Sequence, residues 1–269
     1  MAEKIAVELG NVQKTMLLPL WGRAVETQKD HPLLVDCKAV EIIEKVDYDF
    51  AAMAEKLSPL SMYAWIKRSM FTDQVARAFL QAHPRGTIVN IGCGLDTTFE
   101  RVDNRSLTWY DLDLPDMIAL RRQFITESER RRFITASFLD EGWPGQIKVS
   151  DGLLLIAAGV LYYFSEAQVK GFFARMADAF AGCELVLDVC SPAGIKVANK
   201  RVIESSGLDE KSYLDWGIKS PREILGWDEH YQLLETFWYF KGKDVPKALR
   251  FAGAISDAMK VQYMLHLRL

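Results

Sequence analysis

Two glycines and a pair of carboxylates have the types and spacing to hold a ligand that contains a ribose. Gly92 and Gly94 lie at the end of the apolar run that starts at Thr87, where the backbone must approach a ligand beyond a strand's carboxyl end. Asp111 and Asp113 close the next apolar run, roughly 20 residues on, where a carboxylate can accept hydrogen bonds from both ribose hydroxyls. A lone Gly-x-Gly also occurs in plain tight turns, but the two features together predict a cofactor site.

The residues after the glycines favour S-adenosylmethionine over a dinucleotide. A dinucleotide fingerprint has Gly or Ala where this chain has Thr97, because the helix there must pack closely beneath a pyrophosphate. Asp96 adds a negative charge that suits an anionic pyrophosphate poorly. S-adenosylmethionine has no phosphate and carries cationic sulfonium and ammonium groups, so it tolerates this acid. A nicotinamide-dependent oxidoreductase is therefore a third hypothesis.

The elements that must position these residues are predicted from short apolar runs that alternate with helical stretches. This order is typical of an α/β fold with a mostly parallel sheet, whose strands are buried on both faces. About forty residues of mixed polarity follow the fifth run, too many for an ordinary connection, and predict a lid over residues 191–227. The expected strands cover 87–93, 107–113, 131–137, 152–158, 183–190 and 261–269, with a further structured segment at 230–240 and helices at 116–127, 165–180 and 245–259.

The first part of the chain lacks β alternation and has its apolar residues at helical intervals. The sequence therefore predicts a helical N-terminal cap over residues 1–84 that contributes to the cofactor site. The cap ends at the turn-forming run His83-Pro84-Arg85-Gly86. Residues 85–269 form the second predicted unit, a Rossmann-like domain that contains the lid.

Charge and cysteine content narrow the possible partners. Lys and Arg number 33 against 36 Asp and Glu, so no overall field draws the chain to nucleic acid or to an anionic membrane. The charge-free run at 152–165 is too short to span a bilayer.

The four cysteines lack CxxC spacing, which argues against a zinc site or a disulfide framework and fits a reducing cytoplasm. Two arginine clusters, at 121–122 and 130–132, are expected to be solvated helix ends.

Six segments of the sequence match the motifs of one known family: MLLPLWGRAVE at 16–26, IKRSMFTDQVARAFLQAHP, NIGCGLDT at 90–97, WYDLDLPDMIALRR at 109–122, SFLDEGW at 137–143 and IAAGVLYYF at 156–164. Through them the chain resembles the leucine carboxyl methyltransferase family, and most closely its branch of bacterial polyketide O-methyltransferases of the tetracenomycin type. The first of the six segments resembles that branch in particular. The resemblance implies a class I methyltransferase fold with a mostly parallel seven-stranded sheet, and S-adenosylmethionine as the cofactor.

The same resemblance implies roles for individual residues around the cofactor. Arg68, with Arg23, corresponds to the basic residues that hold the methionine carboxylate, for which a guanidinium offers a charged fork. For Arg23, a surface ion pair is an equally good interpretation. The expected cofactor-binding residues are Arg23, Arg68, Gly92 and Gly94 at the turn, Asp113 at the ribose, Ser137 and Phe138 beside adenine, and Ala158.

Two departures from the family pattern bear on the substrate. Protein-directed members carry Glu where this chain has Ala158, and Ser137 replaces an Asp. Both changes favour a small-molecule acceptor over a protein C-terminal leucine. None of the four histidines lies near the AAGVLYYF segment, and a carboxylate acceptor needs no base because it is already ionised at pH 7.

The sequence therefore predicts an O-methyltransferase that acts on a carboxylate or other acidic oxygen of a small, polyketide-like molecule. Two alternatives stay open: a cofactor-binding protein without turnover, and a methyltransferase of protein or peptide C-terminal carboxyl groups. No catalytic residue is assigned; the candidates are Tyr162 and Tyr163, which follow the fourth strand, and Asp188, which contacts substrate or caps the loop at Ser191. The oligomeric state and the identity of the acceptor are left open.

Overall fold

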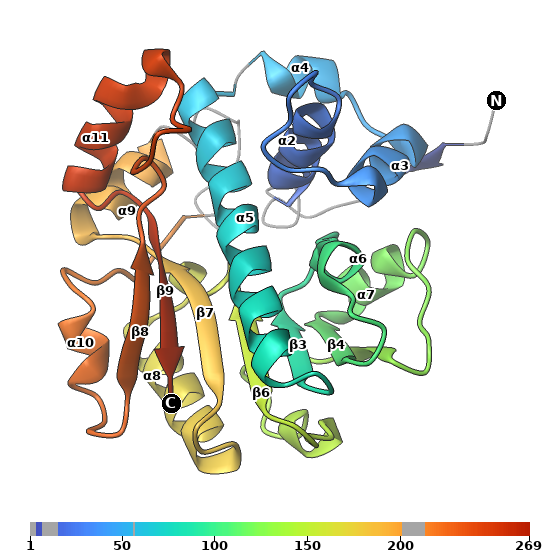
Figure 1. Ribbon diagram of the computed structural model, residues 1–269, viewed down its shortest axis with the longest axis vertical. Helices are drawn as coiled ribbons and strands as arrows, with labels where there is room; N and C mark the ends of the chain where they lie inside the picture. The colour runs from blue at the N-terminus through green and yellow to red at the C-terminus, as the bar shows by residue number, and fades with distance from the viewer. Residues whose placement is uncertain (1–3, 7–15, 56, 201–212) are drawn as a thin grey trace.

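A seven-stranded sheet forms the centre of the molecule (Figure 1). The computed structural model describes residues 4–6, 16–55, 57–200 and 213–269. The strand order is β5-β4-β3-β6-β7-β9-β8, and within the described chain β9 is the one strand of this sheet that runs opposite to the others. The strands are β3 (Thr87–Ile91), β4 (Thr108–Asp113), β5 (Arg131–Thr135), β6 (Leu153–Ala157), β7 (Glu184–Val189), β8 (Gln232–Phe237) and β9 (Tyr263–Arg268). This confirms the predicted mostly parallel α/β fold.

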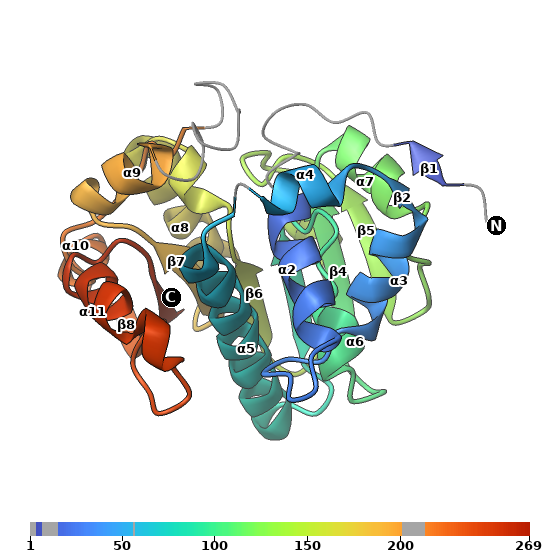
Figure 2. The same cartoon turned by 90° about the horizontal axis from the view of Figure 1, so that it is seen from above.

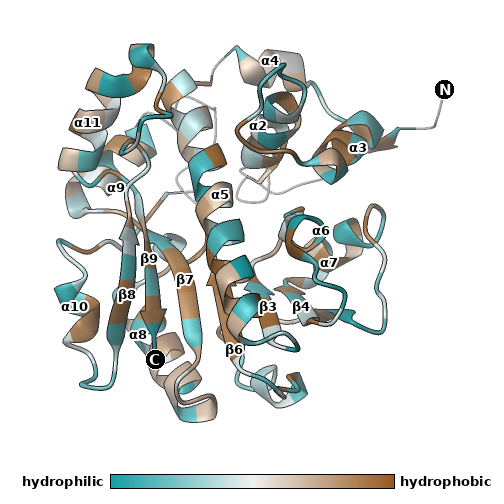
Figure 3. Ribbon diagram, viewed as in Figure 1, coloured by the Kyte–Doolittle hydropathy of each residue, from teal (hydrophilic) through white to brown (hydrophobic). Residues whose placement is uncertain are grey.

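Alternate residues of the central strands enter two different cores, because successive side chains of a strand point to opposite faces. Val89 belongs to the core under α8 (Glu166–Ala179), whereas Ile88 belongs to the core under α5 (Pro59–Ala82). Figures 1 and 2 show these two helices on opposite faces of the sheet. Colouring by hydropathy shows apolar residues concentrated on the strands (Figure 3). Burial on both faces explains the continuous apolar runs that made these strands predictable.

The described part of the N-terminal segment is largely helical. Its helices are α2 (Leu17–Thr27), α3 (Cys37–Lys45), α4 (Phe50–Ala54) and α5. Helices α2 and α3 share a third core with α7 (Pro115–Arg121). Two short strands that the sequence did not predict, β1 (Ile5–Ala6) and β2 (Val46–Asp47), pair in parallel. No helix in the described part of the chain is long and apolar enough to cross a membrane.

Two predicted helices are shorter than expected. Helix α7 ends at Arg121 rather than near Glu127, because the chain tightens into a turn there: Gln123 and Phe124 donate their N–H groups to carbonyls three residues back, at 3.0 Å each. The last helix, α11 (Arg250–Ala258), begins after Pro246 and a turn of 3₁₀ helix at Lys247–Leu249. The residue before a proline is disfavoured in α-helix, so Val245 cannot start it. The remaining helices are α6 (Thr98–Val102), α9 (Pro192–Ala198) and α10 (Arg222–Leu225).

Candidate functional site

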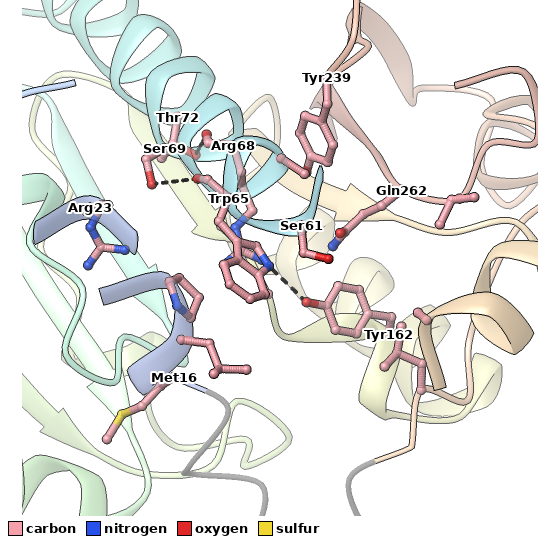
Figure 4. A pocket seen from close by; sticks show the side chains of 18 of the residues that line it. Met16, Arg23, Ser61, Trp65, Arg68, Ser69, Thr72, Tyr162, Tyr239 and Gln262 are labelled. Carbon is pink, nitrogen blue, oxygen red and sulfur yellow. Dashed lines mark hydrogen bonds between the residues drawn. The ribbon is translucent and has the colours of Figure 1, made fainter. Parts of the chain in front are cut away.

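A cavity of about 530 Å³ lies at the carboxyl ends of the parallel strands, where α/β folds bind their ligands. It lies between α2 and α5 on one side and α9 and α11 on the other. In the view of Figure 4, Met16 and Arg23 lie on one side of Trp65, and Tyr162, Tyr239 and Gln262 lie on the other. A volume of this size falls in the range of small-molecule sites.

The glycine turn forms the floor of the cavity beyond β3. Gly92 has φ +60°, and a Cβ atom on it would lie 2.6 Å from Cγ2 of Val160, so only glycine fits there. Gly94 has φ +43° and donates its N–H to Asp113 Oδ2 at 2.7 Å. The other oxygen of Asp113 accepts the N–H of Leu114 at 2.8 Å. Each carboxylate oxygen therefore keeps a lone pair for a further donor.

Arg121 fixes this turn from beneath. Its guanidinium is fully buried, lies 3.0 Å from the carboxylate of Asp111, and donates to the carbonyls of Gly94 at 2.7 Å and Asp96 at 2.9 Å. The prediction that both arginine clusters are solvated helix ends is therefore wrong for Arg121. It is also wrong for Arg131, whose buried Nε binds Asp111 at 2.8 Å. Asp111 is thus a structural carboxylate, whereas Asp113 at the end of the same strand is only partly buried.

A buried charge network lies behind the turn and reaches the cavity through Arg23. Asp36 accepts Nε of Arg23 at 2.8 Å and Nη1 of Arg101 at 2.7 Å, and Arg101 also binds Asp73 through two nitrogens. Burial raises the pKa of Asp96, but the guanidiniums of Arg23 and Arg101 outweigh it and hold that pKa well below its usual value. Arg23 is a buried network residue rather than a surface ion pair, and it lines the cavity together with ionised Asp96.

Arg68 enters the cavity from α5 and is held by Asp188. Its Nη1 lies 3.1 Å from Oδ2 of Asp188, which also accepts Nε2 of Gln262 at 2.7 Å. Oδ1 of Asp188 accepts the N–H of Gly159 at 2.6 Å. A Cβ on Gly159 would lie 3.0 Å from Nη1 of Arg68, so the glycine makes room for the guanidinium. Asp188 therefore joins α5, β6 and the start of β9 instead of capping the loop at its own strand end.

Tyr162 and Tyr163 both line the cavity, as the sequence led us to expect. The hydroxyl of Tyr162 lies 3.5 Å from Nη1 of Arg68, and burial together with Asp188 raises its pKa well above the usual value. The hydroxyl is therefore protonated at neutral pH and cannot act as a base. Trp65, one turn before Arg68 on α5, adds a third aromatic side chain to the lining.

The other expected cofactor residues divide between the cavity and its surroundings. Ala158 lines the cavity with the two glycines, whereas Asp113, Ser137 and Phe138 do not. Phe138 packs into the main core against Phe164 and Phe172. Ser137 Oγ accepts the N–H of Leu139 at 3.2 Å. Ser137 and Phe138 follow β5, two strands from the glycine turn, so the structure brings only part of the expected set around one cavity.

The structure describes only the two ends of the segment that was predicted to be a lid, residues 191–200 and 213–227. Val197, Ala198 and Leu214 line the cavity, while residues 201–212 lie outside the described residues. Trp216 and Ile218 are buried in the main core. These two residues of the predicted lid are therefore part of the core.

Comparison with known proteins assigns the chain to a family. The family model for leucine carboxyl methyltransferase matches residues 17–177. The chain belongs to the leucine carboxyl methyltransferase family. The chain is therefore an S-adenosylmethionine-dependent O-methyltransferase, in agreement with the sequence-based prediction.

Similar proteins support this assignment. The tetracenomycin polyketide synthesis O-methyltransferase of Streptomyces glaucescens is 26% identical over 249 residues, which cover 90% of each chain. An S-adenosyl-L-methionine-dependent methyltransferase of Gibberella zeae is 24% identical, over 82% of this chain and 80% of its own. In fold, a DUF574 family protein of Streptomyces avermitilis matches with a TM-score of 0.59 at 14% identity, over 92% of this chain and 96% of its own.

The charges in the cavity lining complement those of S-adenosylmethionine. S-adenosylmethionine carries a carboxylate, an ammonium and a sulfonium, and the lining offers two guanidiniums, the ionised Asp96 and several aromatic rings. Sequence patterns did not reveal Trp65, Tyr239 and Gln262 as site residues. Trp65 lies three residues before Arg68, and helical spacing could have suggested it; the other two reach the cavity only through the sheet topology.

Proposed function

We propose that this methyltransferase acts on an ionised oxygen, foremost a carboxylate, of a small polyketide-like acceptor. The observation that carries the proposal is the composition of the cavity. All four histidines belong to the described chain, and none of them lines it. A carboxylate acceptor fits such a site because it needs no proton removed before it attacks. The similarity to the Streptomyces glaucescens enzyme of tetracenomycin polyketide synthesis supports an acceptor of this class.

The cofactor would lie over the glycine turn. When bound, S-adenosylmethionine supplies an electrophilic methyl group on its sulfonium sulfur. We assign the methionine carboxylate to Arg68 and Arg23, and the ribose hydroxyls to Asp113. Ser137 and Phe138 remain our candidates beside adenine. Trp65, Tyr162 and Tyr163 would hold the sulfonium region and exclude water, since aromatic faces favour cations.

The proposal predicts a pH profile of kcat that is flat between about pH 7 and 9. The pKa of Asp96 is held low by Arg23 and Arg101 against the effect of burial, so this carboxylate is already ionised. Burial raises the pKa values of Tyr162 and Tyr239 well above their usual value, so both hydroxyls keep their protons. Methylation of an aromatic carboxylate at saturating cofactor would provide the measurement. A rate that rises about tenfold per pH unit would instead show that a proton must be lost before methyl transfer, which a carboxylate acceptor does not require.

Replacing Arg68 by lysine is expected to weaken binding of S-adenosylhomocysteine about tenfold, because lysine cannot reproduce the guanidinium fork. The positive charge beside buried Asp188 is retained, so the protein should stay folded. Calorimetry gives the affinity, and thermal unfolding reports the fold. An affinity within about twofold of the wild type would show that Arg68 serves only its ion pair.

A further inference from the structure

Part of the cavity is lined by α11 and by the residues that follow β8 and precede β9. Strand β8 is antiparallel to β9, and β9 is antiparallel to β7, so β8 runs in the direction of the parallel strands. Its carboxyl end therefore lies at the same edge of the sheet as the glycine turn. This arrangement brings Tyr239 and Phe240, which follow β8, next to Gln262, which precedes β9. Figure 4 shows Tyr239 and Gln262 on the side of the cavity away from Arg23.

The hydroxyl of Tyr239 has no hydrogen-bond partner among the described residues, although the side chain lines the cavity and is only 1% exposed. Burying an unpaired hydroxyl is costly, so a native protein that retains one needs a reason for it. Phenylalanine would fill the same space without this cost. Because the Tyr239 side chain lines the cavity, a bound ligand can supply the missing partner.

The chemistry around the hydroxyl determines which kind of partner it can accept. Burial, together with the carboxylate of Asp188, raises the pKa of Tyr239 well above its usual value. The group is thus a permanent hydrogen-bond donor near neutral pH and suits an acceptor oxygen. The nearby wall is apolar: Phe240, Ile255 and Met259 line the same cavity. A ligand held here would combine an oxygen-bearing head with an apolar body.

We propose that the Tyr239 hydroxyl donates a hydrogen bond to the carboxylate of the methyl acceptor, and that the acceptor's apolar, aromatic body lies against Phe240, Ile255 and Met259. The inference rests on the proposed function, since it assumes an ionised acceptor. A hydrogen bond to one carboxylate oxygen leaves the second oxygen free to attack the methyl group. An O–CH3 bond would form as the S–CH3 bond breaks, and the electron pair of the broken bond would stay on the sulfur of the leaving S-adenosylhomocysteine. Tyr239 is then a binding and orienting residue that selects acceptors with an anionic oxygen.

A matched pair of variants tests the role of the hydroxyl. Tyr263 is also buried and its hydroxyl also lacks a partner in the described chain, but it does not line the cavity. With the full-length enzyme saturated in S-adenosylhomocysteine, 2-naphthoate is the probe, and its binding is followed by fluorescence. Tyr239→Phe should raise the Kd of 2-naphthoate at least about tenfold, whereas Tyr263→Phe should leave it within about twofold. Neither variant should change the affinity for S-adenosylhomocysteine or lower the unfolding temperature.

The outcomes separate this inference from the proposed function. If the wild type binds 2-naphthoate and Tyr239→Phe binds it equally well, the role of Tyr239 is refuted while the proposed function stands. A lower unfolding temperature for Tyr239→Phe alone would mean that the hydroxyl has a structural partner, which also overturns the inference. If the wild type neither binds nor methylates bicyclic and tricyclic aromatic carboxylates, the proposed acceptor class is wrong and both proposals fall.

Discussion

Replacing Arg121 by alanine is expected to lower the free energy of unfolding by about 3–5 kcal/mol. The guanidinium is fully buried between Asp111 and the glycine turn, where it donates to the carbonyls of Gly94 and Asp96. Alanine leaves these carbonyls without their charged donor and opens a cavity beneath the turn. Asp111 keeps Arg131 as a partner, so part of its charge remains compensated. Urea unfolding followed by circular dichroism measures the change.

Arg122 is the matched control for this experiment. It is the next residue in the chain, but its side chain is 49% exposed and pairs with Glu127 at the surface. Such exposed pairs contribute little, so Arg122→Ala should change the free energy of unfolding by less than about 1 kcal/mol. Equal losses for the two variants would mean that Arg121 does not support the turn.

The sheet could be predicted because its strands are buried on both faces. Such strands appear in the sequence as unbroken apolar runs, and Gly and Pro residues mark where they begin and end. The glycine turn and Asp113 were predictable for a related reason, since consecutive parallel strands place their carboxyl ends at one edge. What the pattern could not predict is the burial of Arg121 and Arg131. A pair of arginines at a helix end is normally solvated, and only the packing of α7 against the turn buries the first of them.

The side of the cavity that we assign to the acceptor could not be predicted from the sequence, for a topological reason. Tyr239 and Gln262 are separated by α11 in the chain and by more than a hundred residues from the glycine turn. They meet Arg68 because β9 inserts between β7 and β8 in the opposite direction. No local motif signals such an insertion. The Asp36 network could not be predicted for a similar reason, since its members come from α2, α5, α6 and the start of α3.

Replacing Asp113 by alanine is expected to weaken binding of S-adenosylhomocysteine by at least about tenfold. In our assignment the carboxylate accepts two charge-assisted hydrogen bonds from the ribose hydroxyls, each worth roughly 1.5–3 kcal/mol. Calorimetry measures the loss. Asp111→Ala cannot be the control, because Asp111 is fully buried between Arg121 and Arg131 and its loss would disturb the fold. Asp116, an exposed acid in the first turn of α7, is suitable, and Asp116→Ala should leave the affinity within about twofold.

The alanine variant alone cannot separate ribose binding from support of the turn, because Asp113 also accepts the N–H groups of Gly94 and Leu114. A second ligand resolves this. The 2′-deoxy analogue of S-adenosylhomocysteine lacks one of the two hydroxyls, so the wild type should bind it several-fold more weakly than the parent compound. In Asp113→Ala that preference should disappear, since the group that recognises the hydroxyl is gone. If both ligands instead lose affinity by the same factor, Asp113 only holds the turn, and the ribose must be recognised by another residue.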